Sequence, residues 1–178
     1  MLKNMKKENY INSREFFDKI DAGKKEKKHP WVLCWKLNTP SNIGSILRVA
    51  DNLACEKVLF VDENPNFRDQ RIKQTAQTSF DAVKWEFCKP NEWLALIPKN
   101  YQIIAIETSS NAANLYREDL PKKCVLVLGN EKTGIDKEIL KKCDRTIFIP
   151  MKGKNKSMNV SHALTIVLGE WIRQCYYT

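Results

Sequence analysis

The sequence predicts an α/β fold in which a parallel sheet is covered by helices on both faces. Short apolar segments alternate along the chain with longer segments of helical pattern, and this alternation is typical of strands connected by crossover helices. The apolar segments have the composition of buried strands. A chain of 178 residues, 43% of them hydrophobic, is long enough for one domain with a core and short for two.

Six segments are predicted to be strands of this sheet: residues 31–37, 57–61, 83–87, 103–106, 125–128 and 146–149, of which 83–87 has the weakest pattern. Helices are predicted over residues 41–53, 91–96 and 137–142. The clearest helix comes last, where apolar residues recur at steps of three and four: Val160, Ala163, Leu164, Val167, Leu168, Trp171, Ile172 and Cys175. This stripe must be buried, against its own sheet or against another subunit.

Residues 1–30 are predicted to be a basic extension, and residues 31–178 the folded domain. The extension contains nine Lys or Arg and five Asp or Glu, and a short helix is predicted from Ser13, its N-cap, to Ile20. The lysine-rich run 24–28 is interpreted either as a solvated linker or as a contact to nucleic-acid phosphates. The whole chain carries a net charge of +9 and has a pI near 9.2, which favours a polyanionic partner.

Six cysteines are present without any C-x-x-C spacing, and most lie inside apolar segments. This pattern argues against a zinc site or a disulfide framework, so no metal is expected. The N-terminus is polar and lysine-rich, and no run of apolar residues approaches the length needed to cross a membrane. We therefore expect a cytoplasmic protein that does not bind membranes.

Three segments combine the end of a strand, a polar or glycine-rich turn and the start of a helix: residues 42–50, 126–135 and 149–161, here called the first, second and third segments. Such turns leave backbone N–H and C=O groups unpaired and able to hold a small polar ligand. Gly129 and Gly134 have the spacing of a P-loop, but Ile135 and Asp136 stand where Lys and Ser or Thr are required. A G-x-G-x-x-G motif is also absent from the sequence. These loops therefore suit a purine edge better than a polyphosphate.

In this order, the three segments resemble the three motifs of the SpoU/TrmH family of SPOUT RNA methyltransferases, over roughly residues 31–175. The resemblance implies a deep trefoil knot near the C-terminus, a homodimer, binding of S-adenosylmethionine and methylation of a ribose 2′-hydroxyl of tRNA or rRNA. The sequence of residues 131–135 resembles that of the tRNA guanosine branch of the family, which favours tRNA as the substrate. A non-catalytic RNA-binding or ribosome-assembly module of the same fold is the alternative. A nucleotide-binding enzyme with an ordinary doubly wound sheet is disfavoured by the missing glycine motifs.

The resemblance also assigns site residues. The residues expected to carry catalysis are Arg48, Asn42, Glu131, Ser157 and Asn159. The residues expected to surround the cofactor are Ile106, Thr108, Leu128, Gly129, Ile149, Met151 and Met158. Taken without the family, Arg48 is an ordinary surface arginine, and Asn42, Ser157 or Asn159 is a helix N-cap worth about 1 kcal/mol.

In the family, the arginine of the first motif is proposed to activate the hydroxyl. Deprotonating a free arginine at pH 7 costs on the order of 8 kcal/mol, so we favour Arg48 as an electrostatic stabiliser of the developing alkoxide. We expect both Asn42 and Arg48 to face the carboxyl edge of the sheet, and Gly44 between them to permit close backbone approach.

Three positions depart from the family pattern: Cys55 replaces a glycine, Met158 a leucine and Gly169 an aromatic residue. Of the two histidines, His162 lies beside the third segment and is interpreted as a core or interface residue.

Overall fold

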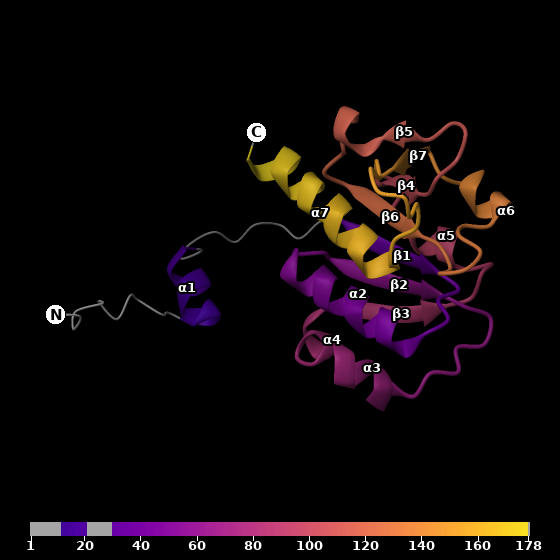
Figure 1. The fold of residues 1–178 in the computed structure, drawn as a ribbon. Helices are drawn as coiled ribbons and strands as arrows, with labels where there is room; N and C mark the ends of the chain where they lie inside the picture. Colours follow the sequence, from indigo (N-terminus) through magenta and orange to yellow (C-terminus); the bar gives the residue numbers. More distant parts are fainter. Residues whose placement is uncertain (1–11, 21–29, 178) are drawn as a thin grey trace.

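The computed structural model describes residues 12–20 and 30–177, and its sheet contains seven parallel strands between two layers of helices (Figure 1). The strand order is β3-β2-β1-β6-β4-β7-β5. The strands are β1 (Trp31–Trp35), β2 (Lys57–Val61), β3 (Lys84–Cys88), β4 (Gln102–Ile106), β5 (Ala113–Asn114), β6 (Cys124–Leu128) and β7 (Arg145–Phe148). All neighbouring pairs are parallel, so the predicted α/β class with a parallel sheet between helices is confirmed.

Side chains that alternate along the central strands form two apolar cores, one on each face of the sheet. On β1, Val32 and Cys34 belong to the core beneath α2 (Pro40–Asn52), α3 (Asp69–Ala76) and α7 (Val160–Tyr176). Trp31, Leu33 and Trp35 belong to the opposite core, which α5 (Trp93–Leu96) and α6 (Lys137–Leu140) cover. Both faces of the sheet are therefore buried, as the apolar composition of the strands predicts.

The last helix packs on its own subunit. The buried residues of α7 are Val160, Ser161, Leu164, Val167, Leu168 and Trp171, and the Trp171 indole Nε1 donates a hydrogen bond to the carbonyl oxygen of Pro121 at 3.0 Å. Figure 1 shows α7 lying beside α2 on one face of the sheet. The opposite side of α7 carries exposed residues, among them Gly169, around which an added Cβ would have no neighbour within 4 Å.

The expected close approach at Gly44 is made by a helix. A Cβ at Gly44 would lie 2.6 Å from Thr75 Cβ, 2.8 Å from the Ile72 carbonyl oxygen and 2.9 Å from the Ala76 nitrogen. These three atoms belong to α3, which crosses α2 at this point. Gly44 therefore permits contact between two helices, and this contact holds α3 against the core.

Several elements differ from the sequence prediction. Strand β1 ends at Trp35 rather than at residue 37, because Lys36 turns the chain with a φ of 49°. Helix α3 was not predicted, since only Ile72 and Ala76 of its eight residues are buried and their apolar pattern is short. The short helix α4 (Ser79–Ala82), the 3-10 turn η1 (Leu115–Arg117) and strand β5 were also not predicted.

The predicted helix near the N-terminus is present as α1 (Ser13–Ile20). The rest of the extension, including the lysine run 24–28, lies outside the described residues. All six cysteines are free thiols. Within residues 12–20 and 30–177, no helix has both the length and the apolar character needed to cross a membrane.

Candidate functional site

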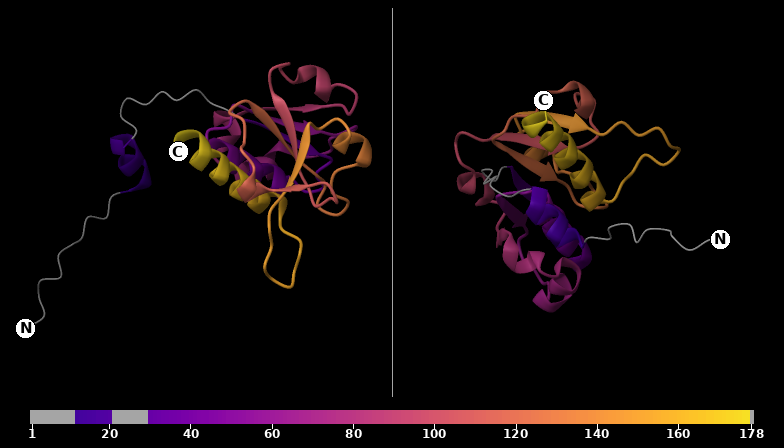
Figure 2. Two further views of the ribbon diagram at one scale, coloured as in Figure 1. Left: turned by 90° about the horizontal axis from the view of Figure 1, so that it is seen from above. Right: turned by 90° about the vertical axis from the view of Figure 1, so that its left-hand side faces the viewer.

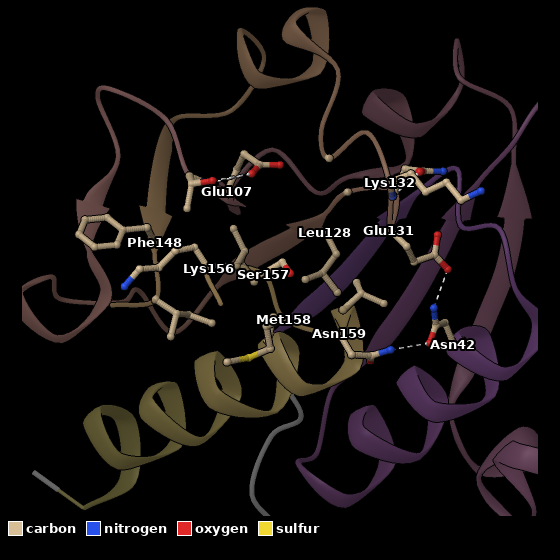
Figure 3. Close-up of a pocket in the computed structure, with 18 of the residues that line it drawn as sticks. Asn42, Glu107, Leu128, Glu131, Lys132, Phe148, Lys156, Ser157, Met158 and Asn159 are labelled. Carbon is tan, nitrogen blue, oxygen red and sulfur yellow. Dashed lines mark hydrogen bonds between the residues drawn. The ribbon is translucent and has the colours of Figure 1, made fainter. Parts of the chain in front are cut away.

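A cavity of about 580 Å³ lies at the carboxyl edge of the sheet, where the loops that follow β1, β4, β6 and β7 meet (Figure 3). Ligands bind at this edge in open α/β sheets, because loops diverge there from strands that end side by side. Each of the three sequence segments contributes to the wall. The third segment forms a long loop that projects from the body of the molecule, as Figure 2 shows.

Asn42 joins all three segments. Its side-chain Nδ2 donates to Glu131 Oε1 of the second segment at 2.6 Å. Its Oδ1 accepts from Asn159 Nδ2 of the third segment at 3.0 Å. Asn42 lies on the first turn of α2, whose N-cap Thr39 and first residue Pro40 place the helix start against the cavity. One amide side chain therefore holds together residues that lie 89 and 117 positions away from it in the sequence.

Glu131 is the carboxylate of this network. Its oxygens accept hydrogen bonds from Asn42, from the backbone N–H of Asn38 at 2.9 Å and from the Thr39 hydroxyl at 3.4 Å. Partial burial raises the pKa of Glu131, but these bonds stabilise the ionised form and together place the pKa below its usual value. A carboxylate with a lowered pKa is a weak base, so Glu131 is suited to holding the turn and orienting Asn42.

Sequence reasoning missed Asn130, which organises the second segment. Its Oδ1 accepts from the backbone N–H groups of Lys132 and Thr133 and from Asn38 Nδ2, and its Nδ2 donates to the Lys36 carbonyl oxygen at 2.5 Å. This side chain ties the turn after β6 to the turn after β1. An asparagine directly after the glycine of a strand-to-turn transition was the available signal, because asparagine commonly bonds to backbone two residues ahead.

The glycines of the second segment allow two stretches of backbone to touch. A Cβ on Gly129 would lie 2.3 Å from the Gly134 carbonyl carbon and 2.5 Å from the Ile135 nitrogen. Gly134 has a φ of 69°, a conformation that side chains disfavour. Backbone hydrogen bonds in both directions between Asn130 and Gly134 close the turn.

In the third segment, Asn159 is the N-cap of α7. Its Oδ1 accepts from the Ser161 backbone N–H at 2.9 Å and from the Ser161 hydroxyl at 2.7 Å, while its Nδ2 reaches Asn42. The Asn159 side chain therefore caps α7 with its oxygen and contacts Asn42 with its nitrogen. The Ser157 hydroxyl bonds to Asn155 Oδ1 at 2.9 Å, and the Lys156 ammonium donates to the Met151 carbonyl oxygen at 2.8 Å.

The structure brings most of the predicted site residues to one place. Every residue predicted to surround a cofactor lines the cavity: Ile106, Thr108, Leu128, Gly129, Ile149, Met151 and Met158. Four of the five predicted catalytic residues line it too: Asn42, Glu131, Ser157 and Asn159. The lining residues that the sequence analysis did not name for this role are Asn38, Thr39, Glu107, Asn130, Lys132, Gly134, Phe148, Lys156, Val160 and Ala163.

Arg48 is not among the residues that line the cavity of its own chain, and its side chain is exposed on α2. The helix geometry explains the position, because six residues at 3.6 per turn place Arg48 about 120° around the helix from Asn42. The expectation that both residues face the cavity edge of one chain is therefore wrong. His162 is also exposed and outside the cavity wall, so it is not a core residue.

A model of the SpoU rRNA methylase family matches residues 30–169. The chain belongs to this family. The match includes all three segments and the whole wall of the cavity.

Two tRNA methyltransferases from other organisms are similar to this chain over the same region. The tRNA (guanosine(18)-2′-O)-methyltransferase of Escherichia coli K12 is 31% identical over 139 residues, which cover 78% of this chain and 61% of the relative. The Aquifex aeolicus protein of the same name is 42% identical over 155 residues, covering 84% and 72%. The chain therefore spans about three fifths of the E. coli relative's length.

Solved structures of SpoU methyltransferases share the fold. The TrmH/SpoU tRNA modifying enzyme of A. aeolicus has a TM-score of 0.73 and 29% identity, covering 84% of this chain and 77% of the other. AviRb of Streptomyces viridochromogenes, solved in complex with the cofactor AdoMet, has a TM-score of 0.75 and 24% identity, covering 88% and 62%. The second likeness concerns the fold alone.

Proposed function

We propose that this protein transfers a methyl group from S-adenosylmethionine to a ribose 2′-hydroxyl of RNA. The observation that supports the proposal most is the contact of all three family motifs at one cavity, through the side chain of Asn42. Relatives that match the chain over about four fifths of its length carry the names of RNA 2′-O-methyltransferases.

The cavity fits the cofactor in size and in lining. Its volume of about 580 Å³ falls within the range usual for small-molecule sites. The side chains of Leu128, Ile149 and Met158 give apolar surface for a purine, and the backbone of these loops offers polar groups for its edge. When bound there, S-adenosylmethionine supplies a methyl group that its sulfonium has already activated.

The chain's own residues have the task of aligning the reacting hydroxyl and removing its proton. Asn42 and Asn159 hold each other in place beside the cavity and can orient a ribose hydroxyl. Glu131 fixes Asn42 through its 2.6 Å hydrogen bond. Its lowered pKa makes it unsuited to accept the proton. The proton therefore goes to a phosphate or to solvent, and a cation near the oxygen stabilises the alkoxide that develops.

We propose that this cation is Arg48 of a partner subunit in a homodimer. Arg48 does not line the cavity of its own chain, which supports a second copy of the chain as the source of the cation. Exposed residues at the start of α2 and of α7, including Ser41 and His162, offer a surface on which such a copy can pack.

Mixed dimers test this arrangement. Arg48→Ala and Asn159→Ala subunits are co-expressed with different affinity tags, and the heterodimer is purified through both. If Arg48 acts across the interface, one site carries both changes and the other carries neither, so about half of the wild-type rate returns. If Arg48 acts within its own chain, each site keeps one defect and the heterodimer is as inactive as either homodimer.

We further propose that the C-terminal region forms the deep trefoil knot implied by the family resemblance. The shared fold of the solved SpoU structures supports this proposal. An experimental structure in which the path of residues 145–177 can be pulled open without crossing the chain would refute it.

The proposed substrate is tRNA, with a guanosine ribose as the target. Support comes from the names of the E. coli and A. aeolicus relatives, although a Neisseria meningitidis relative, 30% identical, is named as a 23S rRNA (guanosine-2′-O-)-methyltransferase. Incubation with labelled S-adenosylmethionine and total RNA, followed by nucleoside mapping, identifies the RNA and the position. RNA binding without label transfer would favour the non-catalytic module.

Residues 31–178 are proposed to be the methyltransferase domain. Residues 1–30 are proposed to be an extension that contacts RNA phosphates, because basic residues outnumber acidic ones there. A tRNA substrate and six free thiols agree with a cytoplasmic location. Removal of residues 1–29 should weaken RNA binding and leave binding of the cofactor unchanged.

A further inference from the structure

Glu107 is a second carboxylate in the wall of the cavity, at the carboxyl end of β4. Figure 3 shows it on the side of the cavity away from Glu131 and Asn42. It is therefore separate from the network that joins the three segments. The proposed transfer of a methyl group does not assign it a role.

The surrounding backbone fixes the position of this carboxylate. Glu107 Oε1 accepts from the backbone N–H of Thr108 at 2.8 Å and from its hydroxyl at 3.3 Å. Oε2 accepts from the backbone N–H of Ile135 at 3.0 Å. A Cβ on Gly134 would lie 2.4 Å from Oε2, so the glycine turn of the second segment comes this close only because it lacks a side chain.

The same geometry leaves hydrogen-bonding capacity at the cavity. A carboxylate oxygen can accept two hydrogen bonds, and among the described residues Glu107 Oε2 accepts one. Glu131 differs, because its contacts to Asn42, Thr39 and Asn38 connect it to the first segment and to the turn that precedes it. Glu107 is thus a preorganised acceptor, and within residues 12–20 and 30–177 its carboxylate accepts hydrogen bonds from Thr108 and Ile135 alone.

The neighbouring residues indicate what this acceptor would bind. Ile106, Leu128 and Ile149 line the same cavity with apolar side chains suited to a purine base. Apart from the exocyclic amine of adenine itself, the ribose hydroxyls are the hydrogen-bond donors of an adenosine that lie nearest to the base. A carboxylate that binds a ribose hydroxyl near the carboxyl end of a parallel strand is a known arrangement in dinucleotide-binding sheets.

We propose that Glu107 accepts a hydrogen bond from a ribose hydroxyl of the cofactor's adenosine, and thereby selects ribose over deoxyribose at this site. The inference rests on the proposed function, because it takes the ligand to be a nucleoside. It assigns Glu107 to cofactor recognition and separates that role from the orientation of the RNA hydroxyl by Asn42 and Glu131.

The test compares ligands that differ in one hydroxyl. Calorimetry measures the dissociation constants of S-adenosylhomocysteine and of its 2′-deoxy and 3′-deoxy analogues, for the wild type and for Glu107→Gln. We expect one deoxy analogue to bind the wild type about tenfold or more weakly, the scale of a hydrogen bond to a charged group. In Glu107→Gln this ratio should fall to about threefold or less. Because the ratio compares two ligands on one variant, any loosening of the turn at Ile135 cancels.

Glu131→Gln is the matched control, since it makes the same change in the other carboxylate of the wall and should keep the wild-type ratio. A fourth ligand, 5′-methylthioadenosine, lacks the amino-acid part of the cofactor. If Glu107→Gln weakens S-adenosylhomocysteine but not methylthioadenosine, the carboxylate binds the ammonium group and the proposal is wrong. Equal binding of ribose and deoxyribose ligands by the wild type also overturns it, while the proposed function stands. A wild type that binds none of these ligands overturns both.

Discussion

The contact between α2 and α3 allows a direct test of the packing at Gly44. In the change Gly44→Ala, the new Cβ would meet Thr75 Cβ at 2.6 Å and two backbone atoms of α3 at 2.8 and 2.9 Å. Both backbone atoms belong to residues of a helix that packs on the core through the fully buried Ile72. The helix must therefore shift to accept a single methyl group.

Two opposing effects set the change in the free energy of unfolding that Gly44→Ala should cause. Alanine is favoured over glycine inside a helix by about 1 kcal/mol, whereas overpacking of a well-packed contact costs about 1–3 kcal/mol. Because backbone atoms cannot rotate away as a flexible side chain can, we expect the upper part of that range. Gly44→Ala should then lower the free energy of unfolding by about 1–2 kcal/mol. For a domain of this size, the melting temperature should fall by roughly 2–8 °C.

Gly169→Ala is the matched control, because it makes the same change inside α7, where an added Cβ has no neighbour within 4 Å. It should raise stability by up to about 1 kcal/mol, which is the helix propensity alone. Urea and thermal unfolding, followed by circular dichroism, measure both variants against the wild type. If Gly44→Ala is as stable as Gly169→Ala, then α3 does not press on α2 as described and the reasoning fails.

Three further predictions concern the site. The folded-state pKa of Glu131 lies below its usual value of 4.5, so the contribution of Glu131 to stability is present above that pH and is lost as the pH falls through the folded pKa. Urea titrations should therefore show that the stability of Glu131→Gln depends less on pH than that of the wild type below about pH 4.5. The same pH dependence in both proteins would count against these hydrogen bonds. Arg48→Ala should lower the methylation rate by about a hundredfold or more at saturating RNA, while calorimetry should show that its affinity for S-adenosylhomocysteine is unchanged. A variant that methylates at the wild-type rate would refute the catalytic role of Arg48. Replacing Lys152, Lys154 and Lys156 by Ala should weaken RNA binding and flatten its dependence on salt, measured by filter binding; an unchanged salt slope would exclude phosphate contacts by this loop.

Local pattern was sufficient to predict six of the seven strands in the described residues and the last helix. Buried parallel strands are continuous apolar runs, so residues 57–61 and 125–128 were recognisable without knowledge of their neighbours. The stripe on α7 was recognisable because a helix packed on a sheet repeats apolar residues every three to four positions. Helix α3 was missed, since a helix of eight residues with two buried positions carries little periodic signal.

The chemistry of the site was predicted in part for a similar reason. Glycine, asparagine and serine in turns that follow strands mark backbone available to a ligand, and all seven residues predicted to surround a cofactor line the cavity. The resemblance to the family assigned these seven residues. The motifs of the family consist of residue types in a fixed order along the chain, and both are properties of the sequence.

Only the tertiary structure decided which side chains meet. Asn42 contacts Glu131 and Asn159, residues 89 and 117 positions away, and no local pattern encodes such a pair. The helical turn of α2 places Arg48 outside the cavity wall of its own chain, although the spacing of six residues suggested that Arg48 and Asn42 share one face of the helix. Glu107 joined the site because β4 ends beside β6 in the sheet, where the turn at Gly134 leaves room for a carboxylate. The sequence by itself determined which groups are available for chemistry, and the packing of strands and helices determined their distances, because hydrogen bonds form only between groups that the fold brings within about 3 Å.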